Sequence, residues 1–495
     1  MIPVSLLLAL LLAFGFEPPP TGVPQADVGT RVLETCGGIT LVAALAFGLG
    51  FWVAFQVSHA GHATSRLRRR YAVGARLLTM LSLVVYGWII HSVGWSKLVQ
   101  TNWGLSRLIL VDDFVVFLPY LLIQLLVWWG LFFAERALQV RLGLGSARGL
   151  GRYLLLRARQ SLGLILPVIL MYVLRRDVLG RFFPGWDESA VAEPIEIAVF
   201  GTLVLAMSPL FVRLAWPARS LPPGPLRRRL ERIAERVGFR FTDILVWDTG
   251  GMVVNACVTG ILPGFRYVLL SDALLESLTP LEAAAVFGHE IGHVAHRHFL
   301  YFAFFFMGSL GLLSLLAEIL SKSGPLLVQF ARLSPWSPSV LSDVIQGVAL
   351  LIALGLYFWV VFGHLSRRFE RQADVFGSKV VSCDLEDCPP HIDLDTDLSP
   401  QSIRGRKPTL CPVGIRIFAE ALANVARSNG LNQNGRSWRH GSIANRIAFL
   451  EGLERHPERE HRFQKGVLRL RLGLGVVLAL AVLLSVVTQT WGLLR

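Results

Sequence analysis

The sequence predicts a mainly α-helical, polytopic membrane protein that also carries a polar region with a small β-sheet. Two observations support this fold class. Apolar residues make up 53% of the 495 residues, and they gather in long runs that alternate with Arg-rich segments. A more polar stretch after residue 217 contains short runs of β-forming residues separated by Gly-rich turns.

Eight apolar runs approach or exceed the roughly 20 residues that a helix needs to cross a bilayer. They lie near residues 37–57, 77–96, 114–134, 160–177, 195–217, 299–321, 343–365 and 471–494. Pro167 interrupts the 160–177 run, and Arg175 ends it early. A shorter run, residues 1–16, is either a signal peptide or a short first span, because it lacks a basic start and has only a poor cleavage site near Ala26.

Charge is uneven between the runs and predicts their orientation. Arg residues crowd the loop after the first run, the loop after the third and the start of the polar stretch: Arg66, Arg68, Arg69, Arg70, Arg76, Arg136, Arg141, Arg148, Arg152, Arg157, Arg159, Arg219, Arg227, Arg228 and Arg229. The intervening connections are neutral or acidic. Since positive loops stay on the cytoplasmic side, the polar stretch is expected there too, provided that 160–177 crosses the membrane.

These boundaries divide the chain into five predicted parts. Residues 1–217 are an N-terminal transmembrane region, 218–298 and 366–466 are the two halves of one polar domain, 299–365 is a transmembrane hairpin, and 467–495 is a C-terminal transmembrane helix. The polar domain starts with the linker 222–225, followed by a basic amphipathic helix near 226–237 and β-like runs at 242–247, 252–258 and 266–270. Residues 382–411 read as an insertion or mobile loop, and 413–427 return to helix.

The cysteines and the net charge argue against two other classes. The five Cys form no disulfide framework, because four of them fall in the predicted cytoplasmic part, where thiols stay reduced. Cys383, Cys388 and His391 are candidates for a second metal site, but their spacing matches no zinc pattern. The net charge of +14 fits loops lying along anionic lipid headgroups, and no nucleic-acid motif is present. Only five of the 48 basic residues are Lys, which hints at a bacterial source.

The run His289-Glu290-Ile291-Gly292-His293 forms an H-E-x-x-H motif within residues 281–298, which read as one helix. Two imidazoles four residues apart share a helix face and can bind one Zn²⁺, while Glu290 can take a proton from metal-activated water. Thr279 and Glu282 predict a capping box at the start of this helix, with Pro280 at its first position. The alternative is a basic helix end with scattered histidines.

A hydrolytic zinc site usually has three protein ligands, so a third ligand is expected elsewhere in the chain. The best candidate is Glu370, with Asp374 four residues later on the same helix face. Asp374 can accept the second ring N–H of a ligand His and fix its tautomer. The alternative is a solvated charged helix. Two predicted crossings separate His293 from Glu370 and none separates Glu370 from His440, so these residues can meet on one side, at or just within the membrane edge.

Four separated segments carry a resemblance to a known family. They are Asn255 to Gly260 (N-A-C-V-T-G), His289 to His293 with His298 five residues beyond, Ser366 to Asp374 (S-R-R-F-E-R-Q-A-D) and His440 to Ile447 (H-G-S-I-A-N-R-I). In this order they are similar to the motifs of membrane-embedded zinc endopeptidases of the HtpX and CAAX prenyl protease type one group. The resemblance covers roughly residues 225–455. Gly441 departs from it, because the family usually has Pro there.

The resemblance implies a set of roles. One Zn²⁺ would be bound by His289, His293 and Glu370, with Asp374 supporting a ligand His. Glu290 would act as general base and then as proton donor to the leaving amine, and His440 would donate a hydrogen bond to the developing oxyanion. Arg446 would lie near the metal and anchor a loop or a carboxylate. Three further residues, Asn255, Ala256 and Gly260, would lie on an edge strand to which a peptide substrate adds.

The expected function is therefore that of a zinc-dependent membrane endopeptidase. It would cut membrane-associated or misfolded membrane proteins at the cytoplasmic face of a bacterial inner or cell membrane, with protein or peptide substrates and the lipid bilayer as partners. One alternative is CAAX-type processing of lipidated C-terminal substrates. An intramembrane site-two-type protease fits less well, because H-E-x-x-H precedes the span and no Asp-Gly pair lies in a late apolar run. A non-catalytic scaffold or transporter would be expected to have lost part of the ligand set.

Overall fold

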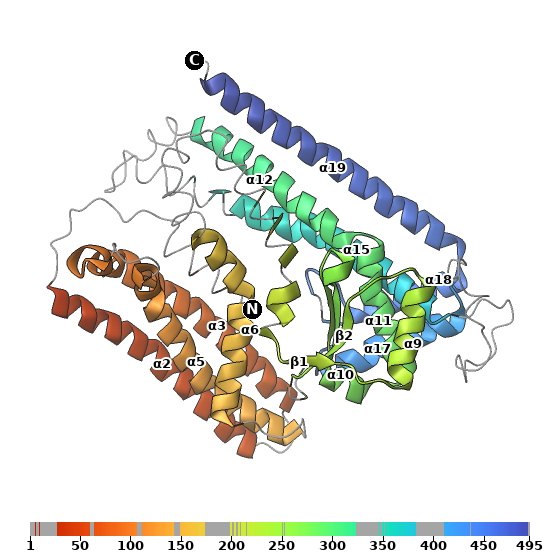
Figure 1. The fold of residues 1–495 in the computed structure, drawn as a ribbon, viewed down its shortest axis with the longest axis horizontal. Helices are drawn as coiled ribbons and strands as arrows, with labels where there is room; N and C mark the ends of the chain where they lie inside the picture. Colours follow the sequence, from red (N-terminus) through yellow and green to blue (C-terminus); the bar gives the residue numbers. More distant parts are fainter. Residues whose placement is uncertain are drawn as a thin grey trace. The chain divides into compact units, whose positions relative to one another are not determined.

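The computed structural model describes most of the chain and divides it into two compact units (Figure 1). Apart from scattered single residues and pairs, the described residues are 27–59, 64–105, 111–142, 149–173, 209–213, 215–249, 253–322, 352–382, 410–435 and 437–493. The first unit comprises Met1–Ser220, Thr242–Val254 and Leu262–Ala273. The second comprises Leu221–Phe241, Asn255–Ile261 and Leu274–Arg495.

Long apolar helices dominate the first unit. They are α2 (Val28–His59), α3 (Thr64–His91), α5 (Val111–Leu142) and α6 (Leu150–Val173), with a short α4 (Trp95–Lys97) and a π-helical turn (Leu98–Asn102) after α3. Helices α2 and α5 lie side by side, and they approach so closely that a Cβ on Gly50 would overlap the carbonyl oxygen of Gly130. Small residues at such crossings allow two backbones to pack directly.

A small mixed sheet completes the first unit. Strand β1 (Ala218–Ser220) pairs antiparallel with β2 (Asp243–Trp247), and β2 pairs in parallel with β4 (Tyr267–Ser271). Every residue of β4 is buried, as expected for an apolar strand in a parallel pair. The predicted runs at 242–247 and 266–270 are confirmed to within one residue, whereas β1 was not predicted. A 3-10 turn (Pro263–Phe265) precedes β4.

Helices also make up most of the second unit. Its elements are α9 (Pro225–Arg236), β3 (Ala256–Thr259), α11 (Pro280–Ala295), α12 (His298–Lys322), α15 (Gly363–Val380), α17 (Pro412–Ser428), α18 (Ile443–Arg455) and α19 (Glu458–Leu493); α10 (Asp272–Ser277) starts at its border. Helix α11 packs against α9, α15 and α17. Helices α12 and α19 run side by side (Figure 1), with Gly308 and Gly311 of α12 against Leu478 and Val482 of α19.

Helix α11 begins where the sequence predicts and ends earlier than it predicts. The Thr279 side chain accepts from the backbone of Glu282, and Glu282 bonds back to the N–H of Thr279, which confirms the capping box. The predicted helix 281–298 is wrong at its C-terminal end, because α11 stops at Ala295. Arg297 adopts a left-handed conformation with φ 56°, and α12 starts afresh at His298. A β-carbon makes this conformation uncommon, which is why the sequence pattern did not indicate the break.

Four helices in the described residues are long and apolar enough to cross a membrane: Val28–His59, Arg70–His91, Val111–Arg141 and Glu458–Leu484. They coincide with four of the predicted spans, so the mainly α, polytopic fold class is confirmed. Helix α12 occupies the predicted 299–321 span, with a shorter apolar stretch, His298–Leu313. The 160–177 segment is helical as far as Val173.

Several expectations fall outside the described residues. These are most of the 1–16 run, parts of the 195–217 and 343–365 runs, and the loop 383–409, which includes Cys383, Cys388 and His391. The described cysteines Cys36, Cys257 and Cys411 are free thiols.

Candidate metal centre

Glycines bring the two site helices into direct backbone contact. A Cβ on Gly288 of α11 would overlap the side chain of Val380 of α15, and one on Gly377 of α15 would lie 2.8 Å from the carbonyl oxygen of Ala285. A Cβ on Gly292, the glycine of the H-E-x-x-H run, would lie 3.1 Å from the Cα of Ala373. These glycines therefore set how near the side chains of one helix lie to those of the other.

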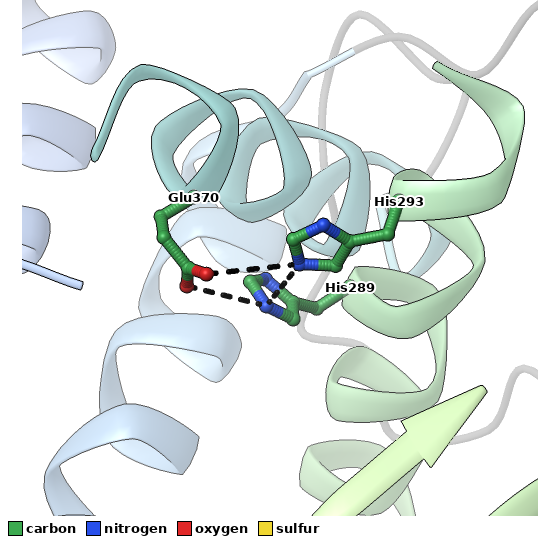
Figure 2. Close-up of side chains that lie close together, drawn as sticks. All are labelled: His289, His293 and Glu370. Carbon is green, nitrogen blue, oxygen red and sulfur yellow. Dashed lines mark hydrogen bonds and ion pairs between the residues drawn. The ribbon is translucent and has the colours of Figure 1, made fainter. Parts of the chain in front are cut away.

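Two imidazoles from α11 and a carboxylate from α15 converge in this contact (Figure 2). The Nε2 atoms of His289 and His293 are 3.2 Å apart, and they lie 3.8 and 4.0 Å from the two carboxylate oxygens of Glu370. One ligand atom from each residue lies within 4.8 Å of the others, so the three residues could hold a metal ion. His289 and Glu370 are buried, and His293 is largely covered.

The second nitrogen of His289 faces a buried carboxylate. His289 Nδ1 lies 3.0 Å from Asp374 Oδ1, although the angle is not that of a straight hydrogen bond. Burial alone would lower the pKa of His289, but the close contact with the Asp374 carboxylate and its negative charge outweigh this and raise the pKa. The contact leaves Nε2 as the nitrogen directed toward His293 and Glu370.

An arginine from α18 links the two carboxylates. Arg446 donates to Asp374 through Nε at 2.8 Å and Nη2 at 2.5 Å, and its Nη1 lies 3.3 Å from Glu370 Oε2. Its side chain is 11% exposed. Burial opposes the ionisation of Asp374, yet the charge of Arg446 more than compensates and lowers the pKa of Asp374 below its usual value. Both carboxylates are therefore held as anions.

His440 reaches the same site from a tight turn. Its Nδ1 lies 2.8 Å from Glu370 Oε1, and half of its side chain is exposed. Burial opposes the ionisation of Glu370, but the bond from His440 and the charge of Arg446 together hold the pKa of Glu370 well below its ordinary value. The turn is closed by backbone bonds between Ser437 and Gly441, and Gly441 has φ 74°. Proline cannot adopt this φ, so the turn in this form depends on Gly441.

Glu290 lies between the ligand cluster and strand β3. Its carboxylate accepts a hydrogen bond from the backbone N–H of Val258, and burial raises the pKa of Glu290 to about 7, with a further rise from the charge of Glu370. A carboxyl group with a pKa near neutrality is suited to both accepting and returning a proton. Burial and the nearby Glu290 also raise the pKa of the Cys257 thiol to about 12, so this thiol stays protonated.

The segment expected to contact a substrate runs beside Glu290. Asn255 is exposed and precedes β3, Ala256 begins the strand and is buried, and Gly260 follows it with φ 100°. Strand β3 is shorter than the predicted strand 252–258: it starts four residues later, at Ala256, and ends one residue later, at Thr259. Asn255 and Gly260 each interact with other groups of the protein.

Comparison with known proteins identifies this part of the chain. Residues 220–465 match the model of peptidase family M48. These residues belong to peptidase family M48. The match contains every residue discussed above, from Asn255 to Arg446. Together with the four apolar helices, the relationship to membrane proteases identifies the protein as an integral membrane protein. The family match also supports protease activity.

Individual relatives cover parts of the chain. CAAX prenyl protease 1 of Saccharomyces cerevisiae is 26% identical over 250 residues, which are 44% of this chain and 52% of that protein. A protease HtpX homolog of Pyrococcus abyssi is 30% identical over 156 residues, 30% of this chain and 49% of that protein. The chain thus spans about half the length of these relatives.

A solved structure has a similar fold. The crystal structure of S. mikatae Ste24p matches with a TM-score of 0.50 and 16% identity, covering 86% of this chain and 100% of that chain. At this identity the likeness concerns the fold. It extends over both the apolar helices and the M48 region, in agreement with the fold class predicted from sequence.

Sequence reasoning missed some residues that the site depends on. Gly288 and Gly377 were not singled out, although their spacing from Gly292 and Ala373 puts small residues on one face of each helix. Gln372, next to Ala373 in the quoted segment, and Arg471, inside a predicted span, were also passed over. An arginine within an apolar helix is costly unless it has partners, and that cost was the available signal.

Proposed function

We propose that this protein is a zinc-dependent membrane endopeptidase that hydrolyses membrane-associated or misfolded membrane proteins at the cytoplasmic face. The observation that carries the proposal is the convergence of His289, His293 and Glu370 from two helices, with Glu290 beside them. Two imidazole nitrogens and one carboxylate are a donor set of zinc peptidases. The fit is supported by the second nitrogens of both imidazoles, which are engaged elsewhere and leave each Nε2 for a metal.

Bound zinc would supply Lewis acidity, which polarises a peptide carbonyl and makes water a stronger nucleophile. Glu290 takes the proton from the attacking water and passes it to the leaving amine. Its Val258 contact holds the carboxylate against β3, where a substrate backbone would lie. Asp374 holds His289 by its Nδ1, so that His289 offers Nε2.

His440 and Arg446 take separate roles in this proposal. Glu370 accepts from Nδ1 of the half-exposed His440, so it is the ring protonated on both nitrogens that would donate from Nε2 to the developing oxyanion. Arg446 is engaged by two carboxylates and buried, which favours anchoring of Glu370 and Asp374 over contact with substrate. Asn255, Ala256 and Gly260 would bind an extended peptide by backbone pairing along β3.

The cytoplasmic placement rests on charge. Arg-rich segments alternate with acidic or neutral ones along the N-terminal region, and the M48 region itself begins with such an Arg-rich segment, which contains Arg227, Arg228 and Arg229. The positive-inside rule then puts the catalytic region on the cytoplasmic side. Accessibility of a cysteine introduced at the exposed Asn434, near the His440 turn, to a membrane-impermeant reagent in intact cells and in lysed cells tests this placement.

One further substrate class has a specific observation in its favour. A relative that matches 250 residues of this chain bears the name CAAX prenyl protease 1, so processing of lipidated C-terminal peptides is the second candidate. Both candidates use the same chemistry and differ in what reaches β3. Peptides with and without a thioether-linked isoprenoid, compared as substrates, distinguish them.

The chemistry is tested with Glu290→Gln. Glutamine keeps the shape of the side chain and spares the metal ligands, so the variant should retain one zinc per chain and lose hydrolysis by about 10²–10⁴-fold. Glu276→Gln, an exposed change on α10, is the matched control and should behave as wild type. Zinc content by mass spectrometry and cleavage of a quenched peptide are measured together. Wild-type hydrolysis by the Glu290→Gln variant would refute the mechanism.

The same variant identifies substrates. Proteins that are bound but not cut by Glu290→Gln should be enriched in a pull-down from membranes and depleted in the control. Zinc binding by the wild type without cleavage of any trapped protein would instead favour the non-catalytic scaffold.

A further inference from the structure

A continuous line of hydrogen bonds leads away from the second nitrogen of His293. His293 Nδ1 lies 2.9 Å from His298 Nδ1, and His298 Nε2 lies 3.0 Å from Gln372 Oε1. Arg471 Nη2 donates to the same oxygen at 2.8 Å, and Gln372 Nε2 donates to Gln464. The line joins α11, α12, α15 and α19, all within the second unit.

The break between α11 and α12 makes the first contact possible. Residues five apart on an uninterrupted helix point about 140° away from one another, so His293 and His298 would not meet on the predicted single helix. The left-handed residue Arg297 turns the chain and brings the His298 ring back to His293. His298 is fully buried and stacks on Phe369 at 4.2 Å, so its ring is held in place.

The direction of every bond in the line follows from Arg471. A guanidinium only donates, so the group of Gln372 that faces it is the oxygen. His298 Nε2 contacts that same oxygen and must donate to it, which leaves Nδ1 of the neutral His298 ring as an acceptor. His293 Nδ1 must then carry a proton and donate. The lone pair of the neutral His293 ring is thereby placed on Nε2, the atom that faces His289 and Glu370.

We propose that His298, Gln372 and Arg471 are positioning residues that hold His293 in the tautomer that binds the metal, so that the C-terminal apolar helix α19 sets a ligand of the site. The inference rests on the proposed function for the identity of the metal. In this proposal Arg471 fixes which atom donates and which accepts in each of these hydrogen bonds, although it does not contact His293 itself.

The environment of Arg471 agrees with a specific role. It is the last charged residue before the apolar part of α19, which continues without a charged side chain from Leu472 to Leu493, and it is partly buried. Its guanidinium lies 4.5 Å from the centre of the Phe369 ring and 5.9 Å from that of Tyr301, and Tyr301 donates to the Arg471 carbonyl. These contacts with neutral groups orient the guanidinium toward Gln372, and among the described residues no carboxylate lies within ion-pair distance of it to compete for its donors.

The first test replaces the acceptor. His298→Phe keeps an aromatic ring against Phe369 but offers no acceptor to His293 Nδ1. Zinc affinity, measured by competition with a chromogenic chelator, should fall about 10–100-fold, the usual cost of losing a partner of a ligand His. The melting temperature of the metal-free protein is recorded alongside. A lower melting temperature with unchanged zinc affinity would mean that these hydrogen bonds only stabilise the fold, and the proposal would fail.

The second test replaces Arg471, which fixes the direction of the hydrogen bonds and lies away from the metal site. Arg471→Met removes the obligatory donor, so Gln372 can turn over and His298 can change tautomer; zinc affinity should drop in the same direction as for His298→Phe, but less. Arg471→Lys, which still only donates, should restore it. Arg469→Met removes the same charge from an exposed position of α19 and should leave affinity unchanged. Equal affinity in the Arg471→Met and Arg471→Lys variants would overturn the proposal, even if His298→Phe fails to fold.

The visible spectrum of the cobalt-substituted protein separates this inference from the proposed function. Wild type that binds neither zinc nor cobalt at the site contradicts the proposed function. Wild type that binds both, with His298→Phe and Arg471→Met giving the wild-type spectrum and affinity, contradicts only the positioning role. A changed spectrum together with weaker binding in both variants supports it.

Discussion

The two imidazoles of the candidate metal centre are held in different ways. On one side, which we call the Asp374 side, His289 Nδ1 faces a carboxylate that Arg446 also binds. On the other, the His298 side, His293 Nδ1 faces a second imidazole and, through it, Gln372 and Arg471. Both arrangements leave Nε2 for a metal. The Asp374 side does so by the attraction of a negative charge. The His298 side does so by a series of hydrogen bonds in which each donor and acceptor is fixed.

The difference has an electrostatic consequence. The Asp374 side raises the pKa of His289, whereas burial and the charge of His289 lower the pKa of His293 to about 3. A carboxylate attracts a proton to its imidazole as well as orienting it, but a neutral partner orients without doing so. The comparison teaches that a ligand His can be directed toward a metal without a negative charge, provided that some group in the line can only donate.

The largest effect is expected where both sides are lost together. Gly377→Val would push α15 away from α11, because even a Cβ there would lie 2.8 Å from the Ala285 carbonyl oxygen and 3.1 Å from the backbone nitrogen of His289. A backbone contact cannot yield as a side chain can, so destabilisation should reach about 3 kcal/mol or more, the upper end of overpacking. Thermal melting and zinc affinity should both fall.

Gly452→Ala is the matched control for this change. Nothing lies within 4 Å of a Cβ at Gly452 in α18, so alanine should stabilise the helix by about 0.5–1 kcal/mol. The two substitutions thus have opposite expected signs. A Gly377→Val protein that melts and binds zinc as wild type does would show that the close approach of the helices does not set the site.

Removal of the Asp374 side alone should have the next largest effect. Asp374→Ala leaves His289 Nδ1 and Arg446 without their carboxylate, so zinc retention should weaken about 10–100-fold without loss of folding. Asp374→Asn, which keeps an oxygen acceptor but no charge, should lie between alanine and wild type. Zinc occupancy during a chelator challenge measures both, and unchanged occupancy in the Asp374→Ala variant would count against a supporting role.

The pH dependence of the metal-free protein sharpens the comparison. His289, with a raised pKa, contributes stability that is fully present below the unfolded value near 6.5 and is lost as pH rises through its folded value. His293 has the opposite sign: as pH falls from about 6.5 toward 3, the unfolded state takes up a proton that the folded state does not, at a cost of up to a few kcal/mol.

Asp374→Asn removes the attraction that raises the pKa of His289 and leaves the cost at His293. The melting temperature of the metal-free Asp374→Asn variant should therefore fall more steeply between pH 7 and pH 5 than that of wild type. At a pH above the raised pKa of His289 both rings are neutral in either protein, so the two slopes should agree there. Parallel curves over the acidic range would show that Asp374 does not control the charge of His289.

The smallest effect on how His289 and His293 are held is expected from a substitution in the turn that carries His440. Gly441→Pro is incompatible with φ 74° and removes the N–H that donates to Ser437, so the turn must rearrange at a local cost of about 1–3 kcal/mol. Gly441→Asn tolerates this φ and should behave as wild type. Peptide cleavage should fall in the Gly441→Pro variant while zinc affinity stays unchanged. A parallel loss of zinc would mean that the turn also supports Glu370.

Local patterns in the sequence determined a large part of this protein. The apolar runs predict the membrane helices, Thr279 and Glu282 predict the start of α11, and the four-residue spacings of His289 with His293 and of Glu370 with Asp374 predict two side chains on one helix face each. These features follow from interactions within a few residues of the chain, which depend on helical periodicity and caps.

Only the tertiary structure decided how these faces meet. The left-handed turn at Arg297, the contact of Gly377 with Ala285, and the donation from Arg471 to Gln372 involve either an uncommon backbone conformation or residues about 90–100 positions apart. Packing selects such contacts from many that the same residues could make, because no local pattern favours one over another. The candidate ligands could thus be predicted from the sequence, whereas the partners that orient His289 and His293 depend on which helices pack together.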